Sequence, residues 1–428
     1  MMKLAFNGGK AIRDKPFPKR SLYNKNKILE YIKNIIDKNN LSGYRGSWGQ
    51  HFWGGEYVKA LEKYFERWFD QGSTTKEKHY VLAVNSCTSA LQIACGAISI
   101  QPFDEVIVTP WSMTCSATAP MIYGANPVFI DIEKDTFCID PKQIEKKITK
   151  NTKAIIAVDL FGNPYDAQKI NKIAKKYNLY VIEDAAQALG ASYNNDLTGT
   201  LGDIGCFSFT QGKHITCGEG GLIVTKNKDL YNRCALIRNH AEAVINSVPS
   251  HLKKYYQDIS NIYGFNMRMT EIQAAICIKQ IQKIHTEISK RLNNVDELTR
   301  MIDIDGIDFA KVRKNSIHSY YVLPFLFDEK KIGLKRELFI DAVKAELTVS
   351  NTDMGVTTIE PALIWSGYIK PIYKMPLFNK NIKLPVVEDL QDNKFCMTSY
   401  HALPLEKKDI QDIVDAFYKV YENIEELK

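Results

Sequence analysis

The sequence predicts an α/β fold, in which a parallel sheet with covering helices is followed by a smaller α/β domain. From residue 80 onward, apolar runs typical of strands alternate with helical patterns, and this alternation is the mark of a parallel sheet. A long helical region follows over 269–302, and beyond it the pattern changes to one strand and two helices, at 316–327, 337–347 and 409–424. We therefore place a large domain at 1–285 and a small C-terminal domain at 286–428.

The amino-acid composition limits the class of protein to which this chain can belong. A chain of 428 residues with 45% hydrophobic and 25% charged residues is ordinary for a globular protein of two domains. No stretch approaches the roughly twenty apolar residues of a spanning helix, so we expect a cytoplasmic protein without a membrane partner. The nine cysteines are scattered without a CxxC pair, which favours reduced packing residues and no metal. A net charge of +7 is modest and forms no stripe, so we expect no nucleic-acid partner.

The N-terminal region begins with a turn-rich arm at 4–18 and a helix at 27–38. A loop rich in glycine and aromatic residues follows, and an amphipathic helix at 57–69 comes after it. The loop contains Trp48, His51, Phe52 and Trp53. Two interpretations stay open for it: a surface loop held together by its own aromatic side chains, or a wall of the substrate pocket.

The alternating region opens with a strand, a small polar turn and a helix over 81–98. Ser86, Thr88 and Ser89 stand at the start of the helix, where free backbone N–H groups and hydroxyls form a natural phosphate site. The same residues are also ordinary helix N-caps. Further strands and helices are expected over 105–132 and 154–166.

Two later stretches have the residue types of a catalytic site. The first, 180–193, begins as a strand and brings Asp184 to its end, with Gln187 close behind. The second, 207–221, places Lys213 before a glycine-rich turn, and an apolar strand follows at 222–225. Burial between strands lowers the pKa of a lysine and makes its free amine a nucleophile. Alone, Asp184 is equally well interpreted as a strand-end acid that caps the next helix.

Several motifs together resemble those of the DegT/DnrJ/EryC1/StrS family of sugar aminotransferases, which use pyridoxal phosphate. An EDAAQ run ends at Gln187, and Ser208 through Lys213 precedes a GEGG turn at 218–221. Similar runs occur at Arg238 to His240, from Gly264 to Ala275, and over 371–378. The resemblance covers essentially the whole chain. It implies the fold-type I aminotransferase architecture, with a large domain whose mixed, mostly parallel sheet is sandwiched by helices.

The resemblance also implies roles for individual residues. Lys213 would attach the cofactor as a Schiff base and move the proton, and Asp184 would pair with the pyridine nitrogen. Gln187 would bond the ring's phenolic oxygen, and Met113 occupies the position of the aromatic residue that stacks on the ring in the family. The phosphate would be held by Ser208, Thr88 and Ser89, beside Cys87, which replaces the family's usual glycine.

Asn266 corresponds to an asparagine that reaches the neighbouring subunit's cofactor in the family, so the resemblance implies a homodimer with shared active sites. The candidate substrate contacts are Trp111, His214, Arg238, His240 and Arg268.

The implied reaction transfers an amino group from glutamate or glutamine to a keto-sugar, either nucleotide-linked or a keto-sugar acid. It would serve amino-sugar or surface-polysaccharide biosynthesis. Related sugar dehydratases have histidine in place of the Schiff-base lysine, and the run from Lys213 to Gly221 has a dehydratase-like His214 but keeps the lysine. A non-catalytic regulator that binds the cofactor is the other alternative, and the intact Lys213, Asp184 and Gln187 argue against it.

Overall fold

The computed structural model describes residues 3–20, 25–241, 244, 247–255, 263–347, 362–365, 370–378 and 381–428. Its centre is a seven-stranded sheet in the order β1-β9-β8-β5-β4-β2-β3. The strands are β1 (Tyr80–Val84), β2 (Glu105–Val108), β3 (Asn126–Phe129), β4 (Thr152–Val158), β5 (Tyr180–Asp184), β8 (Ile204–Ser208) and β9 (Gly221–Thr225). β9 is antiparallel to both of its neighbours, whereas all the other pairs are parallel. The mixed, mostly parallel sheet predicted from the sequence is thereby confirmed.

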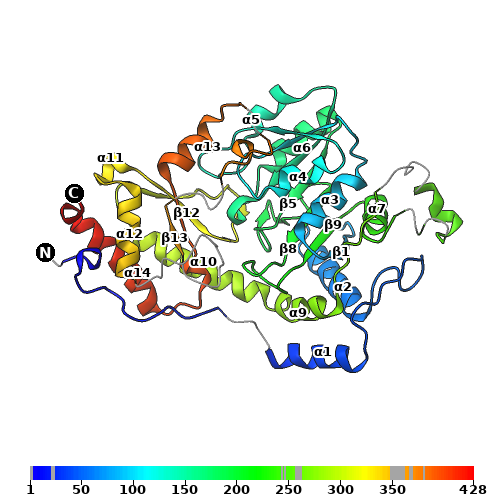
Figure 1. Cartoon of the computed structure of the whole chain (residues 1–428), viewed down its shortest axis with the longest axis horizontal. Helices are drawn as coiled ribbons and strands as arrows, with labels where there is room; N and C mark the ends of the chain where they lie inside the picture. The colour runs from blue at the N-terminus through cyan, green and yellow to red at the C-terminus, as the bar shows by residue number, and fades with distance from the viewer. Residues whose placement is uncertain are drawn as a thin grey trace.

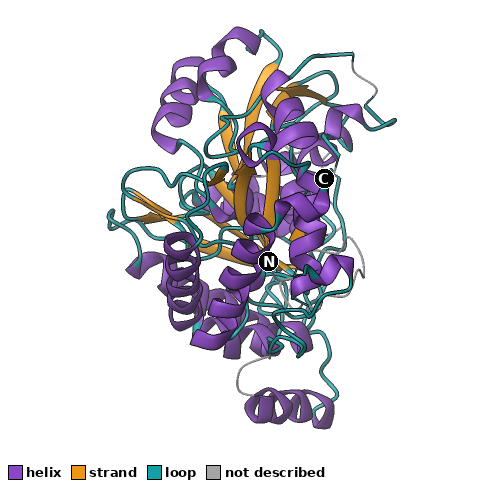
Figure 2. Cartoon of the chain, turned by 90° about the vertical axis from the view of Figure 1, so that its left-hand side faces the viewer, coloured by secondary structure: helices purple, strands orange, loops and turns teal. Residues whose placement is uncertain are grey.

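Helices cover both faces of this sheet, as Figure 2 shows with strands in orange and helices in purple. One face packs on α3 (Cys87–Ala97), α4 (Cys115–Met121) and α7 (Lys228–Arg238). The other packs on α2 (Glu56–Gln71), α6 (Ala167–Tyr177) and α9 (Glu271–Ile281), and α1 (Lys25–Asp37) lies along α9 (Figure 1). Three short helices lie in connections between longer elements: α5 (Pro141–Ile144), α11 (Glu329–Ile332) and α13 (Pro385–Asp389).

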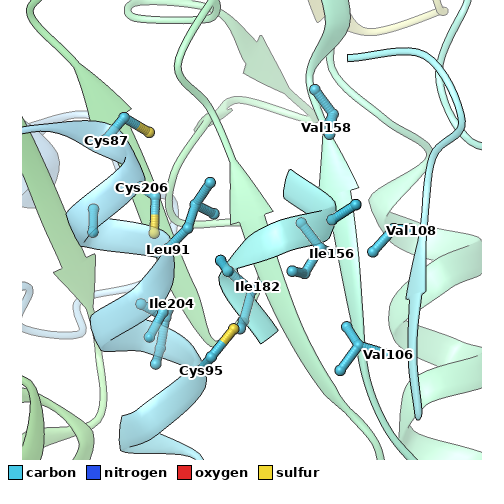
Figure 3. Packing of buried hydrophobic residues seen from close by; sticks show 14 of the residues in the cluster. Cys87, Leu91, Cys95, Val106, Val108, Ile156, Val158, Ile182, Ile204 and Cys206 are labelled. Atoms are coloured by element: carbon cyan, nitrogen blue, oxygen red, sulfur yellow. The ribbon is translucent and has the colours of Figure 1, made fainter. Parts of the chain in front are cut away.

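Alternate residues of each strand point to opposite faces, which explains why both layers of helices are needed. Val106, Val108, Ile156, Ile182 and Ile204 belong to the same apolar cluster as Leu91 and Cys95 of α3 (Figure 3). The residues between them face the other layer, so the strands are apolar on both sides. Each such side chain contributes about 1.5–3 kcal/mol on burial.

A second, antiparallel sheet has the order β10-β12-β14-β13. Its strands are β10 (Ile307–Phe309), β12 (Leu323–Phe327), β13 (Leu363–Ile364) and β14 (Phe395–Thr398). α10 (Ile284–Met301), α12 (Arg336–Glu346) and α14 (Lys407–Glu422) pack with it around one apolar cluster, which also takes in Leu4 and Phe17 of the N-terminal arm. The backbone N–H of Leu4 donates to Glu426, so the two ends of the chain lie close together (Figure 1).

Two expected elements are divided in the structure. The helical region over 269–302 is two helices, α9 and α10. The strand over 316–327 is split into β11 (Ser316–Ile317) and β12, because the chain turns at Tyr320, whose φ is +46°. β11 pairs instead with β6 (Ser192–Tyr193), which also pairs with β7 (Asp196–Leu197).

The change from one apolar core to the other takes place inside α10. Ile284 and Ile288 belong to the cluster around α2 and α9, whereas Val295 and Leu298 belong to the cluster of the second sheet. The proposed boundary near residue 285 stays a prediction. Among the helices that the structure describes, none is both long and apolar enough to cross a membrane.

Candidate active site

Several of the predicted site residues lie at the carboxyl ends of neighbouring strands of the central sheet. β5 ends at Asp184 and β8 ends at Ser208, and both strands run in the same direction. β1 runs parallel to them, and the turn after it leads into the N-terminus of α3 at Cys87. The carboxyl ends of such strands are where open α/β sheets bind their ligands.

Asp184 is buried and held by several short-range contacts. Its Oδ2 accepts a hydrogen bond of 2.7 Å from the Ser116 hydroxyl, and its Oδ1 accepts one of 3.2 Å from the backbone N–H of Ala186. Burial raises the pKa of this carboxyl, while the Ser116 hydrogen bond, the Ala186 hydrogen bond and the Lys213 charge act in the opposite direction. A buried carboxylate in this position is well suited to a cationic ligand group.

Lys213 lies in the loop between β8 and β9, and only 8% of it is exposed. Its amine is 4.2 Å from the ring centroid of Tyr321, a cation–π distance. The Lys213 carbonyl accepts a 2.7 Å hydrogen bond from the guanidinium of Arg20, which also donates to the carbonyl of His214. The loop closes through a 2.9 Å bond from Phe209 N–H to the Gly220 carbonyl. The lysine backbone is therefore fixed from both sides.

Gln187 and Ser208 lie buried near the same strand ends. Gln187 Oε1 accepts a 2.7 Å hydrogen bond from the backbone N–H of Phe161, which fixes the orientation of its amide. The Ser208 hydroxyl accepts a weaker bond of 3.4 Å from Thr210 N–H.

The N-terminus of α3 has the features of an anion site. Ser86 caps the helix and accepts a 3.0 Å bond from Ser89 N–H, whereas Thr88 is exposed. The first N–H groups of a helix lack intrahelical partners and attract anions. A side chain at Gly221 would bring its Cβ to 2.7 Å from the Cys87 nitrogen, so only glycine lets β9 approach the helix start this closely. An amine, a buried carboxylate and an anion-binding helix start are the groups that a phosphorylated pyridine aldehyde requires, so the residues fit pyridoxal phosphate.

Three of the expected substrate contacts are directed into the protein instead. Trp111 is buried against Phe161 and Phe395, and its indole N–H donates to Gln391 at 3.1 Å. Arg238 is fully buried, with its guanidinium 2.8 Å from the carboxylate of Glu62.

His214 is the third expected substrate contact whose side chain is directed into the protein. It is buried, and its Nε2 donates to the Ser319 carbonyl at 3.0 Å. Burial lowers its pKa well below the usual value, so the ring is neutral. The side chains of Trp111, Arg238 and His214 thus serve packing and internal hydrogen bonding in the structure, and their role as substrate contacts stays a prediction.

The other candidates lie at the surface. Met113 is 48% exposed between β2 and α4, and His240 is exposed in a left-handed turn with φ of +67°. Asn266 is exposed, and its Oδ1 accepts a 2.8 Å bond from Arg268. Arg268 also donates to Asn239 at 3.0 Å.

The aromatic loop before α2 is packed against its own chain. Phe52 is fully buried and stacks on Trp48 with 4.6 Å between ring centroids, and Trp53 stacks on Tyr231 of α7 at 5.3 Å. These contacts match the interpretation of a loop held by its own aromatic side chains.

Three residues of the site were not foreseen from the sequence: Ser116, Tyr321 and Arg20. Ser116 follows the expected stacking position within a run of small polar residues, which is a weak local signal. Tyr321 lies in an apolar run that predicts only a strand. Arg20 reaches Lys213 across 193 positions of sequence, and no local pattern announces such a contact.

Comparison with known proteins agrees with this geometry. Residues 44–418 match the DegT/DnrJ/EryC1/StrS aminotransferase family. The chain is 32% identical to the GDP-perosamine synthase of Escherichia coli O157:H7 over 82% of this chain and 89% of that protein. It is 28% identical to a putative L-glutamine:3-amino-2,3-dideoxy-scyllo-inosose aminotransferase of Micromonospora echinospora, over 100% and 99% of the two chains.

Among solved structures, the aminotransferase from Psychrobacter cryohalolentis superimposes with a TM-score of 0.78 at 27% identity, covering 96% of this chain and 100% of that one. The fold-type I architecture is thereby confirmed. The chain belongs to the DegT/DnrJ/EryC1/StrS aminotransferase family and is a pyridoxal-phosphate-dependent sugar aminotransferase.

Proposed function

We propose that this enzyme moves an amino group from glutamate or glutamine to a keto-sugar, with Lys213 and Asp184 as its catalytic residues. The observation that carries the proposal is the buried carboxylate of Asp184, fixed by Ser116 and stabilised by the charge of Lys213. When bound, pyridoxal phosphate supplies the electron sink that makes the Cα proton of an amino acid removable.

Lys213 has two tasks in this proposal. Its amine would hold the cofactor, and as a free amine it would be the base that takes the proton from the donor's Cα. The ring of Tyr321, with its centroid 4.2 Å from the amine, would help to orient it. The hydrogen bonds from Arg20 to the carbonyls of Lys213 and His214 keep the loop in place while the side chain moves.

The other contacts bind and orient the cofactor. Asp184 would hold a proton at the pyridine nitrogen, and this role requires the carboxylate form of its side chain. Gln187 is assigned to the phenolic oxygen and Met113 to the ring face. The phosphate is assigned to Ser208, Thr88 and Ser89, beside the backbone N–H of Cys87 at the start of α3.

The relatives support two kinds of acceptor. The name of the E. coli relative points to a nucleotide-linked sugar, and that of the Micromonospora relative points to a cyclitol with glutamine as donor. We therefore propose a keto-sugar as the amino acceptor, and it is either a nucleotide-linked keto-sugar or a keto-sugar acid. The reaction would belong to amino-sugar or surface-polysaccharide biosynthesis. The nine unpaired cysteines support a reducing compartment, and we assign the enzyme to the cytoplasm.

The test offers the holoenzyme glutamate or glutamine together with nucleotide-linked 3-keto and 4-keto sugars, keto-sugar acids and keto-inositols, and follows products by mass spectrometry. An aminated product and a 2-oxo acid are expected in equal amounts. A product that has lost water without gaining nitrogen would indicate a dehydratase, and cofactor binding without any turnover would indicate a regulator.

We also propose a homodimer in which Asn266 completes the partner's active site. The support is its exposure together with the bond from Arg268 that fixes its amide. Most oligomers use two-fold symmetry, which would give both sites the same residues. Mixing inactive Lys213→Ala and Asn266→Ala subunits after dissociation should restore some activity. No recovery despite proven subunit exchange would place Asn266 outside the partner's site.

A further inference from the structure

The turn after β4 contains a residue other than glycine in a left-handed conformation. Phe161 has a φ of +61° and a ψ of 5°, and Gly162 follows it with a φ of +96°. A positive φ is uncommon outside glycine, and for a bulky residue it is an outlier that the surrounding structure must hold in place. Residues in such conformations concentrate at active sites and ligand-binding segments. The turn is therefore a place where the protein maintains strained backbone next to its cofactor site.

The ring of Phe161 is held by the aromatic core. Only 1% of the residue is exposed, and its ring is stacked on that of Phe395 with 5.2 Å between centroids. Trp111 meets the same ring edge-on at 5.8 Å. Gly162 lets the turn approach its neighbours, because a Cβ there would lie 2.9 Å from the Gln187 carbonyl oxygen. The packed ring and the small glycine together keep the turn against the segment that carries Gln187.

The backbone of Phe161 bonds to two parts of the site. Its N–H donates a 2.7 Å hydrogen bond to Gln187 Oε1, and its carbonyl accepts one of 2.7 Å from the N–H of Tyr321. The ring of Tyr321 is the one that lies 4.2 Å from the Lys213 amine. Tyr320, directly before it, is also left-handed, with a φ of +46°. Because the two peptide groups lie on either side of the Phe161 Cα, a change in its φ would disturb both bonds.

The bond from Phe161 also determines how the Gln187 amide is oriented. A backbone N–H can only donate, so its partner must be the amide oxygen and not the amide nitrogen. The NH2 group of Gln187 therefore lies at the other end of the amide, where it can only donate to a ligand. A donor favours the anionic form of the oxygen that it meets.

We propose that Phe161 is a positioning residue, whose left-handed peptide keeps the NH2 group of Gln187 directed at the phenolic oxygen of the cofactor. The inference rests on the proposed function in one respect, the assignment of Gln187 to that oxygen. If the turn shifts, the hydrogen bond to the oxygen weakens and its anionic form loses stabilisation. The bound cofactor then keeps its proton to a higher pH, and the midpoint of its pH-dependent absorbance change moves upward.

Phe161→Leu and Phe161→Ile are the matched pair that tests this. Both remove the ring and leave an aliphatic side chain of the same composition, but the β-branch of isoleucine makes a positive φ much less favourable. Absorbance of the holoenzyme as a function of pH measures the midpoint for the bound cofactor. The midpoint should rise by about one pH unit in Phe161→Ile and by much less in Phe161→Leu.

The route through Gln187 is tested with a double-variant cycle. Gln187→Leu should raise the midpoint as Phe161→Ile does. The combined Phe161→Ile/Gln187→Leu variant should show no further rise, because the bond that Phe161 orients is already absent. Rises that add up in the combined variant would overturn the inference.

Gly162→Ala displaces the same turn with the Phe161 ring intact, and it decides the question if Phe161→Ile does not fold. Its Cβ would lie 2.8 Å from the Ser319 hydroxyl as well as close to the Gln187 carbonyl. The control is Gly333→Ala, which has a similar φ of +79° but only Lys428 Nζ near its Cβ, at 3.9 Å. Gly162→Ala should raise the midpoint, and Gly333→Ala should leave it unchanged.

Equal midpoints in Phe161→Leu and Phe161→Ile would overturn the inference, since the ring and not the backbone would then be what matters. A rise in Gln187→Leu that neither Phe161→Ile nor Gly162→Ala reproduces would remove the inference and leave the role of Gln187 in place. An unchanged midpoint in Gln187→Leu would refute both. Amino transfer to a keto-sugar is measured separately, from the products, so its failure is distinguishable from all three results.

Discussion

The hydroxyl of Ser116 donates a 2.7 Å hydrogen bond to Oδ2 of Asp184, between residues 68 positions apart in the chain. Burial raises the pKa of Asp184, and this hydrogen bond is the strongest of the influences that lower it. Because the proposed role of Asp184 requires its carboxylate form, Ser116 acts on the reaction through Asp184.

Ser116→Ala should move the acid limb of the pH–rate profile upward by about one pH unit. Without the hydrogen bond the pKa of Asp184 rises further, so the carboxylate is lost at a higher pH. The measurement is kcat as a function of pH. Ser112→Ala is the control, because Ser112 bonds to Ser116 at 3.1 Å and the same change there leaves the bond to Asp184 in place. An unchanged acid limb in Ser116→Ala would contradict the assignment.

Asp184→Asn should retain the cofactor and lower kcat by about 100-fold, or about 2.7 kcal/mol, because a neutral amide cannot hold a proton on the ring nitrogen. Steady-state kinetics at saturating substrates measure the effect. Asp203→Asn is the control. It makes the same change just before β8, at the amino ends of the strands and not at their carboxyl ends, and should leave kcat within a few-fold of wild type. Near-normal activity in Asp184→Asn would mean that the side chain only caps the chain turn after β5.

Arg20→Ala should lower kcat about ten-fold while the cofactor stays attached, because the loop of Lys213 loses charge-assisted hydrogen bonds to two carbonyls. Arg20→Lys should recover part of the loss. Stopped-flow absorbance of the bound cofactor during the donor half-reaction reports the proton transfer directly. Lys15→Ala removes an exposed cation from the same arm and should have no effect. Full activity in Arg20→Ala would show that the arm plays no part in positioning Lys213.

His401 should make the fold sensitive to acid. Burial lowers its pKa to about 3, and its Nε2 donates to the Tyr320 carbonyl at 2.8 Å. An unfolded histidine has a pKa of about 6.5, so below that pH the unfolded chain binds a proton that the folded chain does not. The free energy of unfolding therefore falls as pH falls below about 6.5, and His401 contributes about 1 kcal/mol of that loss between pH 6 and pH 5.

The check is urea unfolding of His401→Gln at these two pH values. Glutamine keeps a donor for Tyr320 but binds no proton, so the fall in unfolding free energy between pH 6 and pH 5 should be smaller by that amount. His251→Gln, at an exposed position, should behave as wild type. The same fall in His401→Gln as in wild type would contradict the buried neutral state.

Local patterns were enough to predict the sheet, most helices and the positions of Asp184 and Lys213 next to strands, whereas their catalytic roles come from the family resemblance and stay predictions. Each of these depends on periodicity or on motifs a few residues long, such as the strand that ends at Asp184 and the glycine turn after Lys213. The split of the strand over 316–327 could not be predicted, because Tyr320 adopts a left-handed conformation inside an apolar run without a glycine or proline before it.

The side-chain environment was harder to predict than the backbone. Trp111 stands two positions before the expected stacking residue, and the structure packs its ring against Phe161 and Phe395, which no local pattern indicated. Arg238 was a candidate substrate contact because of its charge, and the structure shows that Glu62 of α2 pairs with it inside the protein. Such partners are distant in sequence, so only the fold reveals them.

The attachment of the cofactor to Lys213 is the central claim, and borohydride reduction of the holoenzyme followed by peptide mapping tests it most directly. Reduction makes the link between cofactor and lysine permanent, and the amine of Lys213 is buried beside Tyr321, where the site is expected. The account predicts a pyridoxyl group on the peptide that contains Lys213, and no label and no turnover in a folded Lys213→Ala variant. A pyridoxyl group on another lysine, or a Lys213→Ala variant that still turns over, would contradict it.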